Sequence, residues 1–278
     1  MEAREITIGH SPDPDDAFMF YALTHGKLDT GGLRIKHFIS DIETLNHKAI
    51  EGELEVTALS VHAYGYAMDK YALLSCGGSF GDGVGPIVVA KKKMDVGEMA
   101  DDRIAVPGTM TSAYLLLKLL LINFKFEVVP FDKIIDAVLA GEVDAGLLIH
   151  EGQITYEKFG LHKVVDLGRW WQEDIGLPVP LGVNGVRKDL GKPLMRQLSS
   201  LMKQSVDYAL THRADAVKYA MEYGRGMDSV LTDKFVGMYV NKWTTDMGDE
   251  GRASITRLLT RGYHAAVLPR PVHLEFVE

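Results

Sequence analysis

Short apolar runs alternate with helical patterns along the first two thirds of the chain. Residues 145–149 form one apolar run, which follows a helical pattern at 134–140 and a polar turn at 141–144. Helix, turn and buried strand in this order are typical of an α/β unit. Ligands of open α/β sheets bind beyond the carboxyl ends of the strands, so the polar residues after this strand are the first candidates for a site.

The same supersecondary step occurs twice. Residues 49–60 repeat the order found in residues 138–149: a helix end, a Gly-Glu pair, an apolar residue, an acidic residue and a strand. Each copy is preceded by a further strand, polar turn and helix, at 5–23 and at 103–121. Two βαβ lobes are the simplest interpretation.

Two strand-like runs, at 83–90 and 178–186, end in basic residues and are predicted to cross between the lobes. The expected fold class is α/β, with two lobes that each contain a mostly parallel sheet flanked by helices. The larger, discontinuous lobe takes residues 1–90 and 181–278, and the inserted lobe takes residues 91–180. We expect a hinge at the two crossing strands and a ligand cleft between the lobes.

The C-terminal third has the spacing of amphipathic helices. Apolar residues recur at helical intervals over 192–212, the pattern continues over 215–223, and a further helix is predicted to begin at 228. We expect the aromatic and Met side chains here to belong to the core.

Composition and charge narrow the classes of function. The 278 residues are 46% hydrophobic and 24% charged, as in an ordinary globular protein with room for two cores. A net charge of -8 argues against nonspecific binding of nucleic acid. The first residues lack an export signal and no apolar run approaches the roughly 20 residues of a membrane span, so we expect a cytoplasmic protein that does not enter a membrane. A homodimer is an open alternative to a monomer.

The sequence gives no reason to expect a metal or another cofactor. Cys76 is the only cysteine, which excludes an intramolecular disulfide and any multi-cysteine metal site. The histidines show no zinc-type pairing, and no loop has the EF-hand spacing.

His150 and Glu151 follow the apolar run 145–149 directly. An imidazole at a strand end that faces a cleft titrates near neutral pH and is suited to act as a general base. The alternative is a hydrogen-bonded turn residue with no chemical role. Glu151 is open to three roles, which are to orient His150, to contact the ligand, or to cap the following segment.

Hydroxyl side chains stand at two related positions. Thr111 and Ser112 open the predicted helix at 113–121, where hydroxyls and backbone N–H groups are suited to bind an anion. Plain N-capping is the alternative. Ser60 ends the strand of the first lobe that corresponds to 145–149, so it is expected to face His150 across the cleft, unless it only ends the strand.

Two further clusters have structural explanations. Asp13, Asp15 and Asp16 are interpreted as a turn that leads into a helix with acidic residues in its first turn. Trp170 and Trp171 are candidates to stack on an aromatic ligand, and packing beneath the hinge is the equally weighted alternative.

The order and spacing of several motifs resemble the 1,4-dihydroxy-6-naphthoate synthases of the futalosine route to menaquinone, over nearly the whole chain. No single motif is sufficient for this. The motifs are Ser11-Pro12 with Asp15-Asp16, Asp41-Ile-Glu-Thr-Leu-Asn46, Gly83-Val-Gly-Pro86, Val106-Pro-Gly108 with Thr111-Ser-Ala-Tyr114, Ile149-His-Glu151, Asp166-Leu-Gly168 with Trp170-Trp171, and Gly176-Leu-Pro178 with Pro180-Leu-Gly182.

This resemblance implies a periplasmic-binding-protein type 2 fold that is used as an enzyme. The implied reaction cleaves a C–C bond of cyclic dehypoxanthine futalosine and releases 1,4-dihydroxy-6-naphthoate and a three-carbon sugar fragment, dihydroxyacetone. His150 corresponds to the family's general base. The substrate is an aromatic carboxylate, and the substrate-binding positions implied by the resemblance or suited to its two ends are Ala58, Leu59, Ser60, Thr111, Ser112, Glu151, Trp170 and Trp171.

Two other functions remain open. Chorismate dehydratase of the same pathway shares the fold but performs an elimination. A non-catalytic cytoplasmic protein that binds small anions would need the same fold and cleft without a base.

Overall fold

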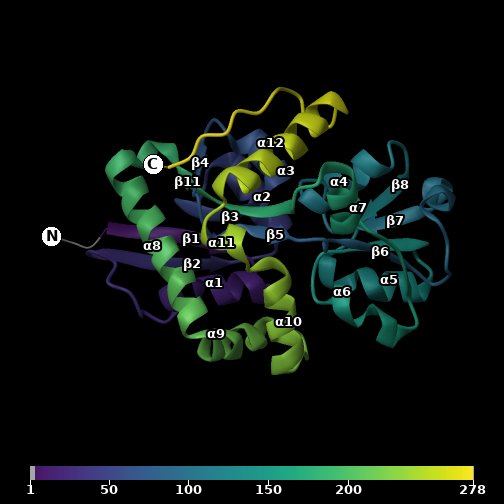
Figure 1. Cartoon of the computed structure of the whole chain (residues 1–278), viewed down its shortest axis with the longest axis horizontal. Helices are drawn as coiled ribbons and strands as arrows, with labels where there is room; N and C mark the ends of the chain where they lie inside the picture. The colour runs from purple at the N-terminus through teal and green to yellow at the C-terminus, as the bar shows by residue number, and fades with distance from the viewer. Residues whose placement is uncertain (1–3, 278) are drawn as a thin grey trace.

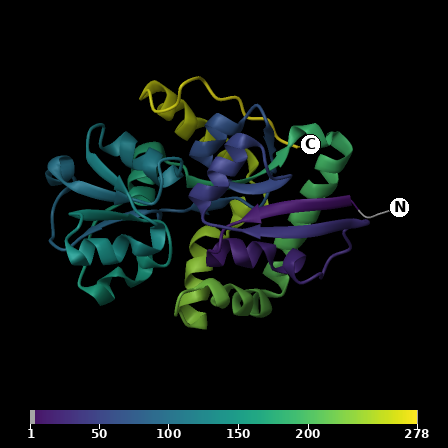
Figure 2. The same ribbon diagram turned by 180° about the vertical axis from the view of Figure 1, so that it is seen from behind.

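The computed structural model describes residues 4–277 and consists of two α/β lobes that lie side by side along the long axis of the molecule (Figures 1 and 2). Each lobe is built on its own sheet, and one continuous segment of the chain forms the second lobe. The two-lobed α/β fold predicted from the sequence is therefore confirmed.

The sheet of the first lobe has the strand order β2-β1-β3-β11-β4, with β5 also paired to β11. β1 pairs in parallel with β2 and β3, whereas β11 is antiparallel to β3, β4 and β5. The strands are β1 (Arg4–His10), β2 (Leu33–Ile39), β3 (Val56–Ser60), β4 (Tyr71–Leu73), β5 (Ser79–Gly81) and β11 (Val179–Arg187).

Helices cover both faces of this sheet (Figure 1). α1, whose residues from Ala17 to Leu23 are all buried, packs with α8 and α9 on one face, and α2, α3 and α12 pack on the other. The helices are α1 (Pro14–Thr24), α2 (Ile42–Glu51), α3 (Val61–Ala67), α8 (Lys192–Thr211), α9 (Arg213–Ala220), α10 (Ser229–Tyr239), α11 (Lys242–Thr245) and α12 (Gly248–His264). The helical interpretation of the C-terminal third is confirmed.

The sheet of the second lobe has the order β10-β6-β9-β7-β8. β7 is parallel to β8 and β9, whereas β6 is antiparallel to β9 and β10. Its elements are β6 (Ile87–Ala90), β7 (Arg103–Val106), α4 (Ser112–Leu120), β8 (Lys125–Val128), α5 (Ile134–Ala140), β9 (Ala145–Leu148), α6 (Gly152–Thr155), β10 (His162–Asp166) and α7 (Leu167–Ile175). Short 3₁₀ helices lie at Val96–Asp101, Phe131–Lys133, Tyr156–Phe159, Lys188–Leu190 and Met221–Tyr223.

Two details differ from the expectation. Both sheets are mixed rather than mostly parallel, because the strand next to each crossing (β6 or β11) runs against its neighbours. The first lobe was expected to extend to residue 90, but Ile87–Ala90 belongs to the second sheet. All four side chains of β6 are buried, alternately on the two faces, and a strand with this pattern needs a neighbour on each edge and cover on each face. The chain crosses at residues 82–86 and 176–178.

The lobes share one apolar core on the hinge side. Leu59 and Tyr64 of the first lobe belong to the same buried cluster as Val88 and Leu115 of the second. At the crossing, a Cβ atom on Gly168 would lie 2.1 Å from the carbonyl oxygen of Val84, so only glycine permits this approach. Close packing here fixes the hinge beside the cleft.

Candidate active site

A cavity with an empty volume of about 680 Å³ lies between the lobes. Strand ends, helix starts and the crossing β11 supply its walls, as expected for ligand sites of open α/β sheets. Its lining residues are Ser11, Asp13, Asp15, Asp16, Ile42, Ala58, Leu59, Ser60, Gly77, Ser79, Pro86, Thr111, Ser112, Ala113, Ile149, Leu181, Gly182, Val183, Asn184, Phe235 and Tyr239.

Ala58, Leu59 and Ser60 line the cavity from the carboxyl end of β3. The Asn46 side chain holds Ser60 in place: its Oδ1 accepts from the Ser60 backbone N–H at 2.7 Å, and its Nδ2 donates to Ser60 Oγ at 3.1 Å. Because Ser60 Oγ accepts the Asn46 bond, the hydroxyl hydrogen is left to point toward a ligand. Asn46 is fully buried, and the sequence did not single it out as part of the site.

Thr111 and Ser112 line the cavity from the opposite lobe, at the start of α4. Thr111 is the N-cap, and its Oγ1 accepts from the Tyr114 N–H at 3.1 Å. Ser112 Oγ donates to the Leu181 carbonyl oxygen at 2.6 Å and accepts from the His62 N–H at 3.3 Å. The capping alternative therefore holds for Thr111, and the Ser112 hydroxyl ties the second lobe to β11.

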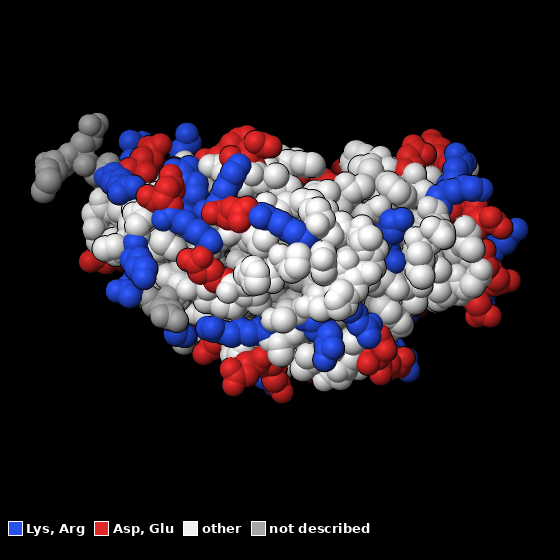
Figure 3. All heavy atoms as spheres, turned by 90° about the horizontal axis from the view of Figure 1, so that it is seen from above, with Lys and Arg blue, Asp and Glu red and all other residues white. Residues whose placement is uncertain are grey.

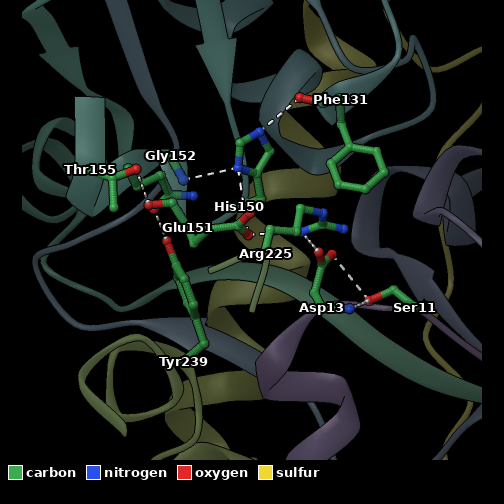
Figure 4. A network of polar contacts seen from close by, with 10 residues as sticks. Ser11, Asp13, Phe131, His150, Glu151, Gly152, Thr155, Arg225 and Tyr239 are labelled. Carbon is green, nitrogen blue, oxygen red and sulfur yellow. Dashed lines mark hydrogen bonds and ion pairs between the residues drawn. The ribbon is translucent and has the colours of Figure 1, made fainter. Parts of the chain in front are cut away.

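His150 lies just beyond β9, one residue after the cavity-lining Ile149, and is itself buried. Its Nδ1 accepts from the Gly152 backbone N–H at 2.9 Å, and its Nε2 donates to the Phe131 carbonyl oxygen at 2.8 Å (Figure 4). Burial lowers the pKa of His150, against the opposing effect of Glu151. The imidazole is thus neutral with Nδ1 as its acceptor, which is the form that a general base requires.

Glu151 connects His150 to the first lobe. Its Oε2 lies 3.7 Å from His150 Nδ1 and 2.8 Å from Nη1 of Arg225. Arg225 Nη1 also lies 3.5 Å from Oδ1 of Asp13, which lines the cavity. Of the three roles open for Glu151, the geometry favours orienting its neighbours through this ion-pair chain (Figure 4).

The sequence interpretation missed the acidic wall of the cavity. Asp13, Asp15 and Asp16 do stand at the start of α1, as expected, but all three also line the cavity. Asp15 Oδ2 accepts from Ser79 Oγ at 2.8 Å, and Asp16 Oδ2 accepts from the Ser11 N–H at 2.8 Å. Their position after β1 is the strand-end signal that identified His150.

Burial raises the pKa of Asp13 to about 7 and that of Asp16 to about 8, and the charge of Asp15 adds to both shifts. At pH 7 a carboxyl group with a pKa of about 8 is mostly protonated and one with a pKa of about 7 is half protonated, and the protonated form can donate a hydrogen bond. Within residues 4–277, no group of three or more His, Cys, Asp or Glu side chains is placed to hold a metal ion.

Neither Trp170 nor Trp171 lines the cavity. Trp171 is fully buried in the core shared by the lobes, and the guanidinium of Arg261 lies 5.8 Å from its ring centre. Trp170 packs against the same core from the partly exposed side of α7. The geometry favours the packing alternative for both.

Charged side chains of both signs are interspersed on the face shown in Figure 3. No continuous basic stripe crosses that face. Among residues 4–277, no helix is long and apolar enough to cross a membrane.

Comparisons with known proteins agree with this architecture at the level of fold. The chain superimposes on an alkanesulfonate-binding protein from Xanthomonas axonopodis bound to MOPS with a TM-score of 0.75, 14% identity and coverage of 98% of this chain and 96% of that one. A Candida albicans protein described as having the generic periplasmic binding protein fold superimposes with a TM-score of 0.72, 12% identity and coverage of 99% and 97%. These likenesses establish the two-lobed fold alone.

Closer relatives cover the whole length. A protein of known structure from Archaeoglobus fulgidus has a TM-score of 0.91 and 48% identity over 96% of this chain and 100% of its own. The 1,4-dihydroxy-6-naphtoate synthase of Thermus thermophilus is 43% identical over 98% of this chain and 99% of its own, and that of Streptomyces coelicolor is 38% identical over 97% and 96%. The model of the family described as "Menaquinone biosynthesis" matches residues 6–264, and the chain belongs to this family.

Proposed function

We propose that this protein is a carbon–carbon lyase that converts cyclic dehypoxanthine futalosine to 1,4-dihydroxy-6-naphthoate and dihydroxyacetone. The observation that carries the proposal is the identity of 43% and 38% to two 1,4-dihydroxy-6-naphtoate synthases over nearly their whole length. The cavity between the lobes is the proposed site, because substrate-binding positions expected from the sequence line it from both lobes, Ser60 from the first and Ser112 from the second.

His150 is the proposed general base. It takes the proton from a hydroxyl group of the sugar-derived part, the C–C bond to the ring system breaks, and the electron pair of that bond enters the bicycle as it becomes aromatic. Nδ1 is the basic atom in the observed tautomer, so the substrate hydroxyl must replace the Gly152 N–H as its partner. The Gly152 N–H then loses its acceptor, at a cost of about 1–3 kcal/mol that substrate binding must offset.

The substrate carboxylate is proposed to lie between Ser60 and the start of α4 at Thr111 and Ser112. A helix N-terminus and a hydroxyl with a free hydrogen both favour an anion. Ala58 and Leu59 then contact the ring system from β3.

The acidic wall is compatible with an anionic substrate because of its protonation. Three ionised carboxylates would repel the substrate, whereas the pKa values of about 7 for Asp13 and about 8 for Asp16 leave Asp13 half neutral and Asp16 mostly neutral at pH 7. In the neutral form they donate hydrogen bonds to oxygen atoms on which negative charge develops when the bond breaks.

The direct test is to incubate the purified protein separately with cyclic dehypoxanthine futalosine and with chorismate, and to identify the products by mass spectrometry. We expect naphthoate and the three-carbon fragment from the first and unchanged chorismate from the second. Elimination product from chorismate would replace this proposal with the dehydratase. Binding of the naphthoate without any turnover of either substrate would replace it with a binding protein.

A further inference from the structure

Arg225 bridges the cleft from a loop of the first lobe (Figure 4). Its Nη1 lies 2.8 Å from Glu151 Oε2 on the opposite lobe and 3.5 Å from Asp13 Oδ1 on its own. The guanidinium also lies over the ring of Phe131, 4.6 Å from the ring centre. One side chain therefore contacts both lobes at the edge of the cavity.

The backbone of Arg225 is strained. Its φ is +44°, in the left-handed region that side chains other than Gly and Asn rarely adopt, and it stands between Gly224 and Gly226. Strain of this kind persists only where surrounding contacts compensate for it, and it is concentrated at functional sites. The contacts to Glu151, Asp13 and Phe131 are that compensation.

Arg225 contacts the two residues that surround the His150 ring. The Phe131 carbonyl oxygen accepts the Nε2 proton of His150, and the Phe131 ring lies under the guanidinium. The Glu151 carboxylate lies 3.7 Å from His150 Nδ1 and forms the ion pair with the Arg225 guanidinium. A shift of Arg225 must therefore move or uncover both neighbours of the imidazole.

We propose that Arg225 is a positioning residue that closes the cleft and, through Glu151 and Phe131, holds His150 in its reactive orientation. The inference of closure needs only the observed contacts of Arg225, whereas the effect on His150 rests on the proposed function. The side chain of Glu151 is only 8% exposed, so without Arg225 its charge would be buried without a counterion and the second lobe would gain by moving away into water. Further hydrogen bonds join the lobes elsewhere: Tyr239 donates to Gln153, Ser112 to the Leu181 carbonyl oxygen, and the Met110 N–H to the Glu43 carboxylate.

Arg213 offers a matched control within one lobe. It pairs with Asp233 at 2.7 Å, and its guanidinium lies 5.4 Å from the ring centre of Phe18. Both partners belong to the first lobe. Arg213→Gln therefore removes the same kinds of contact as Arg225→Gln without opening the cleft.

Closure is measured first, by small-angle X-ray scattering with and without the naphthoate product. We expect wild type and Arg213→Gln to have the same radius of gyration, and Arg225→Gln to be more extended in the absence of product. This measurement does not depend on turnover, so it remains decisive even if the proposed reaction is wrong. Equal radii for all three proteins would overturn closure by Arg225.

The effect on His150 is measured by kinetics. We expect Arg225→Gln to lower kcat at least tenfold with a smaller change in KM, and Arg213→Gln to keep kcat within about twofold of wild type. The charges that act on His150 are those of Arg225, which lowers its pKa, and of Glu151 and Asp132, which raise it. The acidic limb of the kcat/KM profile should therefore move to higher pH in Arg225→Gln and return in Arg225→Lys.

A merely structural role would lower activity without moving that limb. If Arg225→Gln folds poorly, Glu151→Gln is the alternative variant, because it breaks the same ion pair from the other side. Because both changes remove one contact, the double variant should lose no more activity than the worse single variant. An unmoved acidic limb together with additive losses would overturn the positioning role while leaving the proposed reaction intact. Failure of the wild type to turn over the substrate would overturn the proposed reaction instead.

Discussion

The backbone N–H of Gly152 donates a hydrogen bond to Nδ1 of His150 at 2.9 Å, and the glycine is required for it. A Cβ atom at position 152 would lie 2.7 Å from Cε1 of the imidazole, which is too close for any side chain. The bond fixes the tautomer, because an Nδ1 that accepts leaves the proton on Nε2, where the Phe131 carbonyl oxygen receives it. The Nδ1 lone pair is thus fixed in direction by the Gly152 N–H, and His150 directly follows Ile149, which lines the cavity.

Replacing His150 by Ala should separate binding from chemistry. We expect turnover to fall by about a hundredfold or more, the size of a general-base contribution, while the naphthoate product still binds. Steady-state kinetics and titration calorimetry measure the two effects. His264, an exposed residue of α12, provides the control, and His264→Ala should behave as wild type. Unchanged turnover in His150→Ala would assign the base to another group.

Replacing Asp16 by Asn should stabilise the protein at alkaline pH. The folded-state pKa of Asp16 is about 8, well above its ordinary value of 3.8, so the folded form retains a proton that the unfolded form has lost. The favourable contribution of this group is present below pH 4 and is lost as the pH rises toward 8. Asn remains neutral and can still accept from the Ser11 N–H.

Thermal unfolding at pH 5 and pH 8 checks this expectation. The melting temperature of Asp16→Asn should exceed that of wild type by more at pH 8 than at pH 5. Asp136→Asn, an exposed change in α5, should show no such dependence on pH. An equal shift at both pH values would mean that Asp16 is ionised throughout.

The fold could be predicted because its signals are local. Burial alternates along β6 between two apolar faces, and α8 spans Lys192–Thr211 where helical spacing was predicted over 192–212. The crossing was misplaced at residue 90 because a glycine-rich connection and a buried strand form one apolar run in the sequence. Local pattern cannot tell which sheet such a strand joins.

Some residues of the candidate site could also be predicted from local sequence, and others could not. Ser60 could be found because it ends a strand, and Thr111 and Ser112 because they open a helix; the resemblance to a family pointed to the same positions. The acids of α1 have an ordinary explanation as first-turn residues, which concealed their place in the cavity wall. Arg225 stands 74 residues from Glu151, and only the closed arrangement of the lobes brings them together.

Replacing Asn46 by Ala should impair both stability and substrate binding. The Ser60 N–H would lose Oδ1 of Asn46, its side-chain acceptor. Asn46 is fully buried, so bulk water does not replace the lost acceptor. An unsatisfied buried donor costs about 1–3 kcal/mol, so chemical denaturation should give a free energy of unfolding lower by that amount. KM should rise because Ser60 is no longer held. Ser60→Ala removes the acceptor of Asn46 Nδ2 and should also raise KM; if Ser60→Ala leaves KM unchanged, Ser60 does not contact the substrate.

Replacing the two tryptophans separates packing from ligand stacking. Trp171 is fully buried in the core and does not line the cavity, so Trp171→Ala should lower the free energy of unfolding by about 3–5 kcal/mol. Trp170 lies outside the cavity lining, so Trp170→Ala should leave KM within about twofold of wild type. Both are measured by denaturation and by steady-state kinetics on the same preparations. A rise in KM of tenfold or more in Trp170→Ala, with normal stability, would show that α7 moves toward the ligand when substrate binds and would restore the stacking role that its place in the sequence suggests.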